Sequence, residues 1–142
     1  MKKKNCNCEF KNERSRLLLE NFRKSLAEQS TISAERAFRD AVSSPAPRFW
    51  VSEARATAVI RLMLKGKDPT VSMIAEKARM YREIYRRVVR LLEKEPAQPL
   101  GDLVFRVVNS EAPSYYMCVK HARRLVGEAK KLQKATKIWK LK

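Results

Sequence analysis

Apolar residues recur at helical spacing in six stretches of this chain, with polar residues between them. In the first stretch, Leu18, Phe22 and Leu26 fall on one face of a helix. Ser33 and Ser52 precede two later stretches and suit the N-cap position, because a serine hydroxyl accepts a hydrogen bond from the first turn. The predicted helices span about residues 12–28, 34–43, 53–64, 74–94, 103–110 and 118–133. The pattern predicts an all-α fold.

The second half of the chain repeats the first half at a spacing of 66 residues. The segment APRFWV at 46–51 returns without gaps as APSYYM at 112–117. A repeat at a fixed period indicates one structural unit built twice. A unit of about 50 residues is marginally stable alone. We therefore expect the two copies to pack together.

The pattern and the repeat together predict two tandem three-helix units. In each unit the second and third helices resemble a helix-turn-helix arrangement, although their connection of about nine residues is longer than the usual turn. The predicted divisions are a disordered basic N-terminus at 1–11, a first unit at 12–65, a linker at 66–73, a second unit at 74–133 and a basic tail at 134–142. The tail either extends the last helix or forms an arm that becomes ordered on contact with a partner. Asp102 is the expected cap of the helix at 103–110.

The net charge predicts an anionic partner. The chain has 32 Lys and Arg against 15 Asp and Glu, a formal charge of +17. Such an excess repels itself in a compact fold, and nucleic acid is the partner that it best fits. DNA is favoured over RNA. The predicted helix faces carry few polar side chains besides Lys and Arg, so we expect contact mainly with phosphates and a modest sequence preference.

Candidate binding residues are Lys and Arg on the predicted outer faces of the helices and on the tail. They are Arg48, Arg55, Arg61, Lys65, Arg79, Arg82, Arg86, Arg90, Lys120, Arg123, Arg124, Lys131, Lys134 and Lys137. The arginines at 79–90 form one row, and arginine suits bidentate contact with phosphate. A charged helix face is also commonly no more than solvated, so both interpretations stay open for this row.

The two aromatic pairs in the repeated segment have two interpretations. Phe49-Trp50 and Tyr115-Tyr116 either stack on unpaired bases or wedge between helices. Aromatic residues at the same places in both copies, next to prolines, fit the packing interpretation better.

The sequence offers no catalytic constellation. It has a single histidine, His121, no glycine-rich phosphate loop and no paired carboxylates in a polar pocket, so we predict a protein that is not an enzyme and needs no cofactor. Cys6, Cys8, Cys118 and His121 would supply the four ligands that a structural zinc site needs. In the first copy, however, Ser52 and Arg55 stand where Cys118 and His121 stand in the second, and we predict no metal site.

No apolar run reaches the roughly 18 residues of a membrane span. The basic start Met1–Lys4 is followed by polar residues instead of the apolar run of a signal peptide. We therefore expect a cytoplasmic protein without a membrane partner.

Three segments carry a resemblance to known proteins: RFWVSEARA at 48–56, MYREIYRRVV at 80–89 and VVNSEAP at 107–113. Over about residues 12–130 the chain resembles a group of short basic helical proteins of gut Bacteroidales and their phages or mobile elements. The resemblance implies a genetic context and no activity. The alternative function is a structural or assembly protein of a phage or mobile element, found in the virion. Its basic surface would dock nucleic acid or an acidic protein, with self-association as a further possibility.

Overall fold

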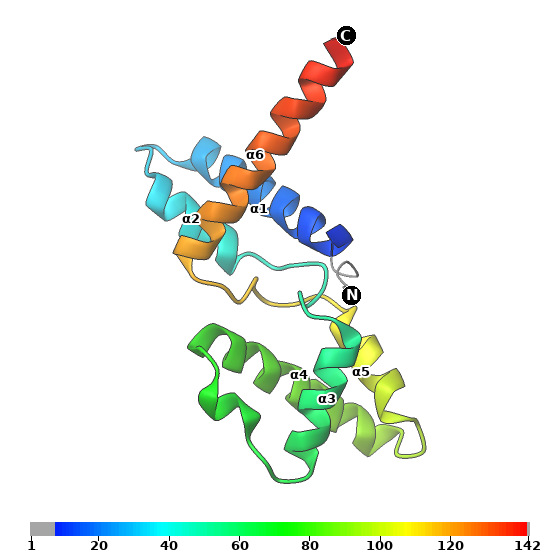
Figure 1. The fold of residues 1–142 in the computed structure, drawn as a ribbon. Coiled ribbons are helices and arrows are strands. Elements are labelled where there is room, and N and C mark those ends of the chain that lie inside the picture. The colour runs from blue at the N-terminus through cyan, green and yellow to red at the C-terminus, as the bar shows by residue number, and fades with distance from the viewer. Residues whose placement is uncertain (1–7, 142) are drawn as a thin grey trace. The chain divides into compact units, whose positions relative to one another are not determined.

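The computed structural model describes residues 8–141 of the chain, and the side chains of residues 10–135. Within the described residues it contains six α-helices and one short 3-10 helix (Figure 1). They are α1 (Cys8–Glu28), α2 (Ala34–Ser43), α3 (Glu53–Leu64), η1 (Pro69–Ser72), α4 (Ala75–Lys94), α5 (Leu100–Val108) and α6 (Val119–Leu141). The predicted all-α fold class is confirmed.

The helices form two compact units that exchange their third helices. Unit 1 contains α1, α2 and α6, from residues up to Ser44 and from Met117 onwards. Unit 2 contains α3, η1, α4 and α5, in residues Pro45–Tyr116. Each unit therefore takes two helices from one copy of the repeat and the third helix from the other copy.

This exchange differs from the predicted tandem units at 12–65 and 74–133, which are not confirmed. The helix-turn-helix expected from neighbours in the sequence does not form, because α2 and α3 belong to different units, as do α5 and α6. The long connection between α2 and α3 explains the difference. A tight turn would fold the third helix back onto the second, whereas these residues lead the chain out of one unit and into the other.

The core of unit 1 is made by one apolar face from each of its helices. The rings of Phe22 on α1 and Phe38 on α2 stack with their centroids 4.3 Å apart. Residues no more than 6% exposed fill this core: Leu18, Leu19, Phe22, Ala37, Phe38, Ala41, Ala122, Leu125, Val126 and Ala129. Among the described side chains of α6, Ala129 is the last buried one, and the C-terminal part of the helix extends past α1 and α2 (Figure 1).

Unit 2 repeats this plan with the equivalent positions. Its core residues are Ala56, Val59 and Ile60 from α3, Tyr81, Ile84 and Val88 from α4, and Leu103, Val104, Val107 and Val108 from α5. η1 adds Thr70, which is 2% exposed. The third helix of the first copy, α3, thus occupies the same position in unit 2 as α6 does in unit 1.

The two repeated segments pair with each other inside unit 2. The Ala46 N–H donates to the Ala112 carbonyl at 2.9 Å, and the Ala112 N–H donates to the Ala46 carbonyl at 2.8 Å. The aromatic rings pair across the segments, Phe49 with Tyr116 at 6.1 Å and Trp50 with Tyr115 at 6.0 Å between centroids. Only Tyr116 is more than 8% exposed, so the packing interpretation of the aromatic pairs is confirmed.

Capping explains why several predicted helix boundaries agree with the structure. Ser33 and Ser52 accept hydrogen bonds from the backbone N–H of Arg36 at 3.2 Å and of Arg55 at 3.1 Å, and both N-cap predictions are confirmed. The prediction for Asp102 is wrong: Pro99 occupies the N-cap of α5 and Asp102 lies in its first turn. Proline can hold this place because its extended backbone leads into the helix and its carbonyl accepts the first bonds.

The remaining differences are at the ends of the chain and in the linker. α1 begins at Cys8, inside the segment predicted to be disordered, and the rest of that segment lies outside the described residues. α6 continues to Leu141, so the tail extends the last helix. The predicted linker at 66–73 contains η1.

Candidate nucleic-acid interface

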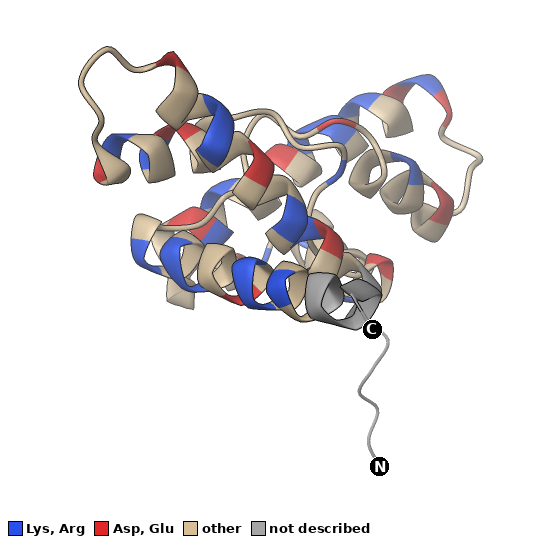
Figure 2. Cartoon of the chain, turned by 90° about the horizontal axis from the view of Figure 1, so that it is seen from above, with Lys and Arg blue, Asp and Glu red and all other residues tan. Residues whose placement is uncertain are grey.

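The excess of positive charge is concentrated in the sequence of unit 1. Its residues include 19 Lys and Arg against seven Asp and Glu, a net of +12, whereas unit 2 has 13 against eight, a net of +5. Figure 2 marks the charged residues of the described part of the chain on the ribbon, with Lys and Arg in blue and Asp and Glu in red. The helix that unit 1 receives from the second copy accounts for most of the difference, since residues 120–142 hold nine Lys or Arg and one acid.

Four cations on the outer face of α6 form a row that we call the α6 row: Lys120, Arg124, Lys131 and Lys134. Their spacing puts them opposite the buried face of the helix, because residues at i, i+4, i+11 and i+14 fall on one side. All four side chains are exposed. Among the described residues, none of the four is in an ion pair. The α6 row is therefore an unneutralised positive strip about 21 Å long.

Gly127 stands at the middle of the α6 row, where the equivalent residue of α3 is Arg61. A Cβ atom added at Gly127 would meet no atom within 4 Å. The helix backbone is consequently open to close approach by a ligand at this point. Glu128 is the single acid of the described part of α6 and lies beside the row.

Two further cations of α6 lie beside the α6 row over aromatic rings of unit 1. The Arg123 guanidinium is 4.6 Å from the centroid of Phe38, and the Lys130 ammonium is 5.2 Å from that of Phe22. Both side chains remain exposed. These contacts hold the two cations, seven residues apart, along one edge of α6 and leave their charges available to an anion.

A half-buried arginine on α1, Arg14, adds positive charge near the start of the α6 row, and no motif or spacing in the sequence singles it out. The Nε atom of Arg14 is buried without a hydrogen-bond partner. Burial and the nearby Arg124 lower the pKa of Arg14, and burial together with Arg14 and Arg124 lowers the pKa of His121. Burial is the main cause of both shifts, and the neighbouring guanidinium charges add to it.

Three exposed arginines of α1 and α2 differ from the α6 row because they have acidic partners, whereas the exposed Arg23 of α1 donates to the Gln133 side chain at 3.1 Å. Arg16 pairs with Glu20 at 2.8 Å, and Arg39 with Glu35 at 3.5 Å. Arg36 is 3.9 Å from Asp40 in the same way. Each pair is one helical turn apart, as in an ordinary solvated helix face.

The predicted arginine row of α4 is partly neutralised. Arg86 pairs with Glu83 at 2.5 Å, and Arg82 donates to the Thr70 hydroxyl at 3.2 Å. The hydrogen bond and charge of Glu83 raise the pKa of Arg86. At the two ends of the row, Arg79 and Arg90 are exposed and form no ion pair within the described residues. Three of the four predicted arginines therefore have no ion pair among the described residues, and one of these three, Arg82, is hydrogen-bonded to a neutral hydroxyl.

Arg48 has a structural role in the repeated segment. Its Nε and Nη2 atoms donate to the carbonyls of Phe49 at 3.0 Å and Val51 at 2.8 Å, and its guanidinium lies 5.9 Å from the Trp50 ring. The side chain is half-buried and its donors are used by its own segment. Its placement as a nucleic-acid contact therefore has no support from its geometry.

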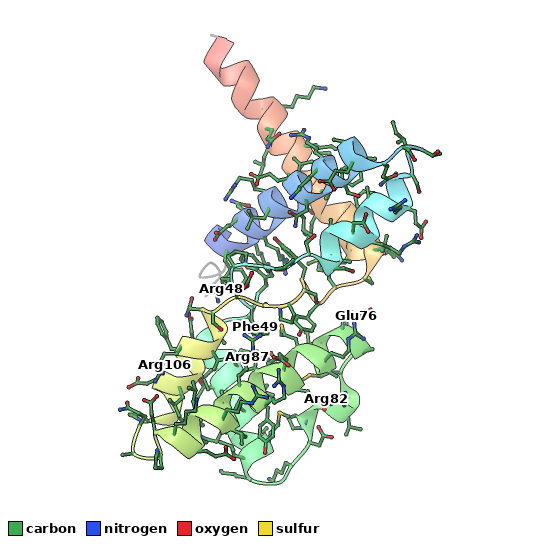
Figure 3. The ribbon with its side chains drawn as sticks, turned by 180° about the vertical axis from the view of Figure 1, so that it is seen from behind. Arg48, Phe49, Glu76, Arg82, Arg87 and Arg106 are labelled. Atoms are coloured by element: carbon green, nitrogen blue, oxygen red, sulfur yellow. The ribbon has the colours of Figure 1, made fainter. Side chains whose placement is uncertain are left out.

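Arg87, which was not among the candidates, holds α4 against the same segment (Figure 3). It pairs with Glu83 at 2.8 Å, donates to the Glu111 carbonyl at 2.8 Å and lies 5.0 Å from the centroid of Phe49. Spacing alone placed Arg87 at the flank of the α4 row and gave no sign of these contacts.

The outer face of α3 is a weaker version of the α6 row. Arg55, Arg61 and Lys65 are exposed, but Ala54 and Ala58 stand where α6 has Lys120 and Arg124. The remaining predicted site residue, Lys137, has its side chain outside the described part of the chain. The structure therefore gathers one continuous group of unpaired cations, on α6, and leaves the others dispersed over α3 and α4.

Other kinds of site find no counterpart in the part of the chain that the structure describes. No three His, Cys, Asp or Glu residues come together there as a metal site would need, and Cys118 is an exposed free thiol. Cys6 lies outside the described residues. None of the described helices combines the length and apolar character needed to cross a membrane. No protein-family model, curated protein or solved structure matches the chain, so the candidate interface is defined by its own residues alone.

Proposed function

We propose that this protein is a non-catalytic nucleic-acid-binding protein that contacts duplex DNA mainly through its phosphates. The observation that carries the proposal is the α6 row, four exposed cations on one helix face with no acidic partner among the described residues. Outside α6, the exposed candidate cations that have no ion pair among the described residues are dispersed over α3 and α4 instead of forming one strip. A continuous strip of unpaired cations can neutralise successive phosphates of a nucleic-acid backbone.

The composition of the α6 face supports a modest sequence preference. Reading base edges takes bidentate donors and acceptors such as Asn and Gln besides Arg. Between Lys120 and Lys134 the outer face offers only cations and Gly127. Such a face is suited to phosphates, which position a protein on DNA without reporting its sequence.

The shape of the helix favours duplex DNA over duplex RNA. The major groove of B-form DNA, about 12 Å wide, admits an α-helix, whereas the major groove of A-form RNA is too deep and narrow. An α6 that either enters the groove or lies along its edge would bring the four cations to phosphates.

The test is a binding titration of the full chain on labelled duplex DNA over a salt series, with duplex RNA and an unrelated DNA sequence as competitors. Counterion release predicts that log K falls linearly with log salt, with a slope of about −0.9 for each phosphate contact. We expect the slope to be about −3.6 or steeper, because the α6 row alone would make four phosphate contacts. The unrelated DNA should compete nearly as well as the unlabelled form of the probe sequence. Absence of binding at low salt would refute the proposal, and stronger competition by the RNA would refute the preference for DNA.

A further inference from the structure

The two copies of the repeat supply equivalent helices to the two units. α1 and α4 are the first helices of the copies, α2 and α5 the second, and α3 and α6 the third. The first two helices of each copy form a hairpin in one unit, and that hairpin is completed by the third helix of the other copy. Neither copy contains a complete unit.

The hydrogen bonds and ring pairs between the repeated segments have the pattern of an interface between two identical partners. Such an interface is self-complementary: if residue i contacts residue j, then the equivalents of i and j also contact each other. Ala46 and Ala112 are equivalent and exchange both backbone hydrogen bonds. The Phe49–Tyr116 pair becomes, on exchanging the copies, the Tyr115–Trp50 pair, and both are present.

We propose that the repeat is a dimerisation module whose partner is a second copy of itself, and that the two halves of this chain, 1–67 and 68–142, are such a pair. Each hairpin presents an apolar surface that accepts the third helix of the other copy. This inference concerns assembly and goes beyond the proposed binding of nucleic acid.

The surfaces at the two exchanged helices are complementary and well buried. In unit 1, Leu125 and Val126 of α6 are at most 5% exposed. In unit 2, Val59 and Ile60 of α3, at the equivalent positions of the repeat, are also at most 5% exposed. The same two positions of the third helix therefore bury apolar side chains in both units, and removing that helix would open the core of the hairpin that it covers.

A cut between the halves distinguishes this exchange from tandem units. The loop at 65–68 is exposed, and Gly66 has a positive φ of 89° that should be kept. We would insert the site of a sequence-specific protease between Lys67 and Asp68, because Asp68 caps η1. After complete cleavage, we expect both fragments to elute together in size exclusion at the volume of the uncut chain, with unchanged helical circular dichroism. Fragments that elute separately would overturn the proposal.

Hydrogen exchange on the uncut full chain shows which hairpin each third helix protects. We expect Val126→Ala on α6 to lower the protection of α1 and α2, the helices of the first copy. Ile60→Ala on α3 should lower the protection of α4 and α5, the helices of the second copy. Each substitution truncates one buried side chain, and we expect the packing to loosen first in the hairpin that the helix covers.

The controls place a small substitution on the exposed side of the same helices. Ala58→Ser on α3 and Ala135→Ser on α6 are at exposed positions and should leave protection unchanged. Loss of protection in the hairpin of the same copy, or a uniform loss in all helices, would overturn the proposal. Neither the cleavage experiment nor the hydrogen exchange involves nucleic acid. A negative result in either would therefore be distinct from a failure of DNA binding.

Discussion

Neutralising the α6 row should remove most of the salt dependence of DNA binding while leaving the fold intact. The perturbation is the fourfold variant Lys120→Gln, Arg124→Gln, Lys131→Gln and Lys134→Gln. Glutamine is a good helix former of similar length. All four positions are exposed and lie opposite the face that packs on α1 and α2, so the core of unit 1 is untouched.

The magnitude follows from the number of unpaired cations. Four phosphate contacts contribute a slope of about −3.6 to log K against log salt. When salt rises fourfold, from about 50 to 200 mM, this part of the slope corresponds to a loss of about 150-fold in affinity. The wild-type chain should show this loss, and the fourfold variant should lack it.

Fluorescence anisotropy on a labelled duplex measures the two slopes. The matched control is the variant Arg16→Gln, Arg36→Gln, Arg39→Gln and Arg106→Gln, which loses the same formal charge. Its four arginines are exposed and all have acidic partners within 4.0 Å. We expect the control to keep a slope within about one unit of the wild type. Equal slopes for the fourfold variant and its control would refute the argument, because total charge instead of the α6 row would then determine binding.

Three further substitutions test the fold and the interface. Phe49→Ala removes a ring that is 0% exposed and should lower the free energy of unfolding by about 3–5 kcal/mol in urea titrations, whereas a loss below about 1 kcal/mol would contradict its packing role. Burial raises the pKa of Glu83, but hydrogen bonds from Arg86 and Arg87 outweigh this effect and hold the pKa below its usual value. The ionised Glu83 therefore stabilises the folded protein above the pKa of the unfolded state. This stabilisation is lost as the pH falls through the pKa of the folded state. Glu83→Gln should therefore flatten the fall in thermal stability below about pH 4.5, and an unchanged acid limb would count against this pairing. Gly127→Arg adds a cation at an open position of the α6 row and should steepen the salt slope by about one unit, with an unchanged slope as the contrary result.

Helix positions could be predicted from the sequence because their causes are local. The bounds of α2 and α3 agree with the prediction, since Ser33 and Ser52 cap the helices and their apolar spacing extends over only a few turns. The α5 boundary was missed because Pro99 and Asp102 both suit the start of a helix, and spacing alone did not rank them.

The candidate site could be predicted only in part, because pairing between charges depends on contacts distant in sequence. The α6 row followed from helical periodicity and the lack of acids in the last part of the chain. The role of Arg48 did not, since its donors are taken by backbone carbonyls of a segment whose shape the sequence does not specify. Arg87 contacts Phe49 and Glu111, which are 38 and 24 residues away, and helical spacing gives no information on either.

The sequence by itself determined that this protein is helical, basic and built twice from one repeat. Only the tertiary structure decided which third helix completes which hairpin. The apolar faces of α3 and α6 are nearly the same at equivalent positions, so either helix fits either hairpin as far as hydrophobic pattern is concerned. In the structure the repeated segments exchange hydrogen bonds between Ala46 and Ala112, and each of them connects a second helix in one unit to a third helix in the other. As a result, the most basic helix of the second copy packs on the hairpin of the first, and places the α6 row in unit 1.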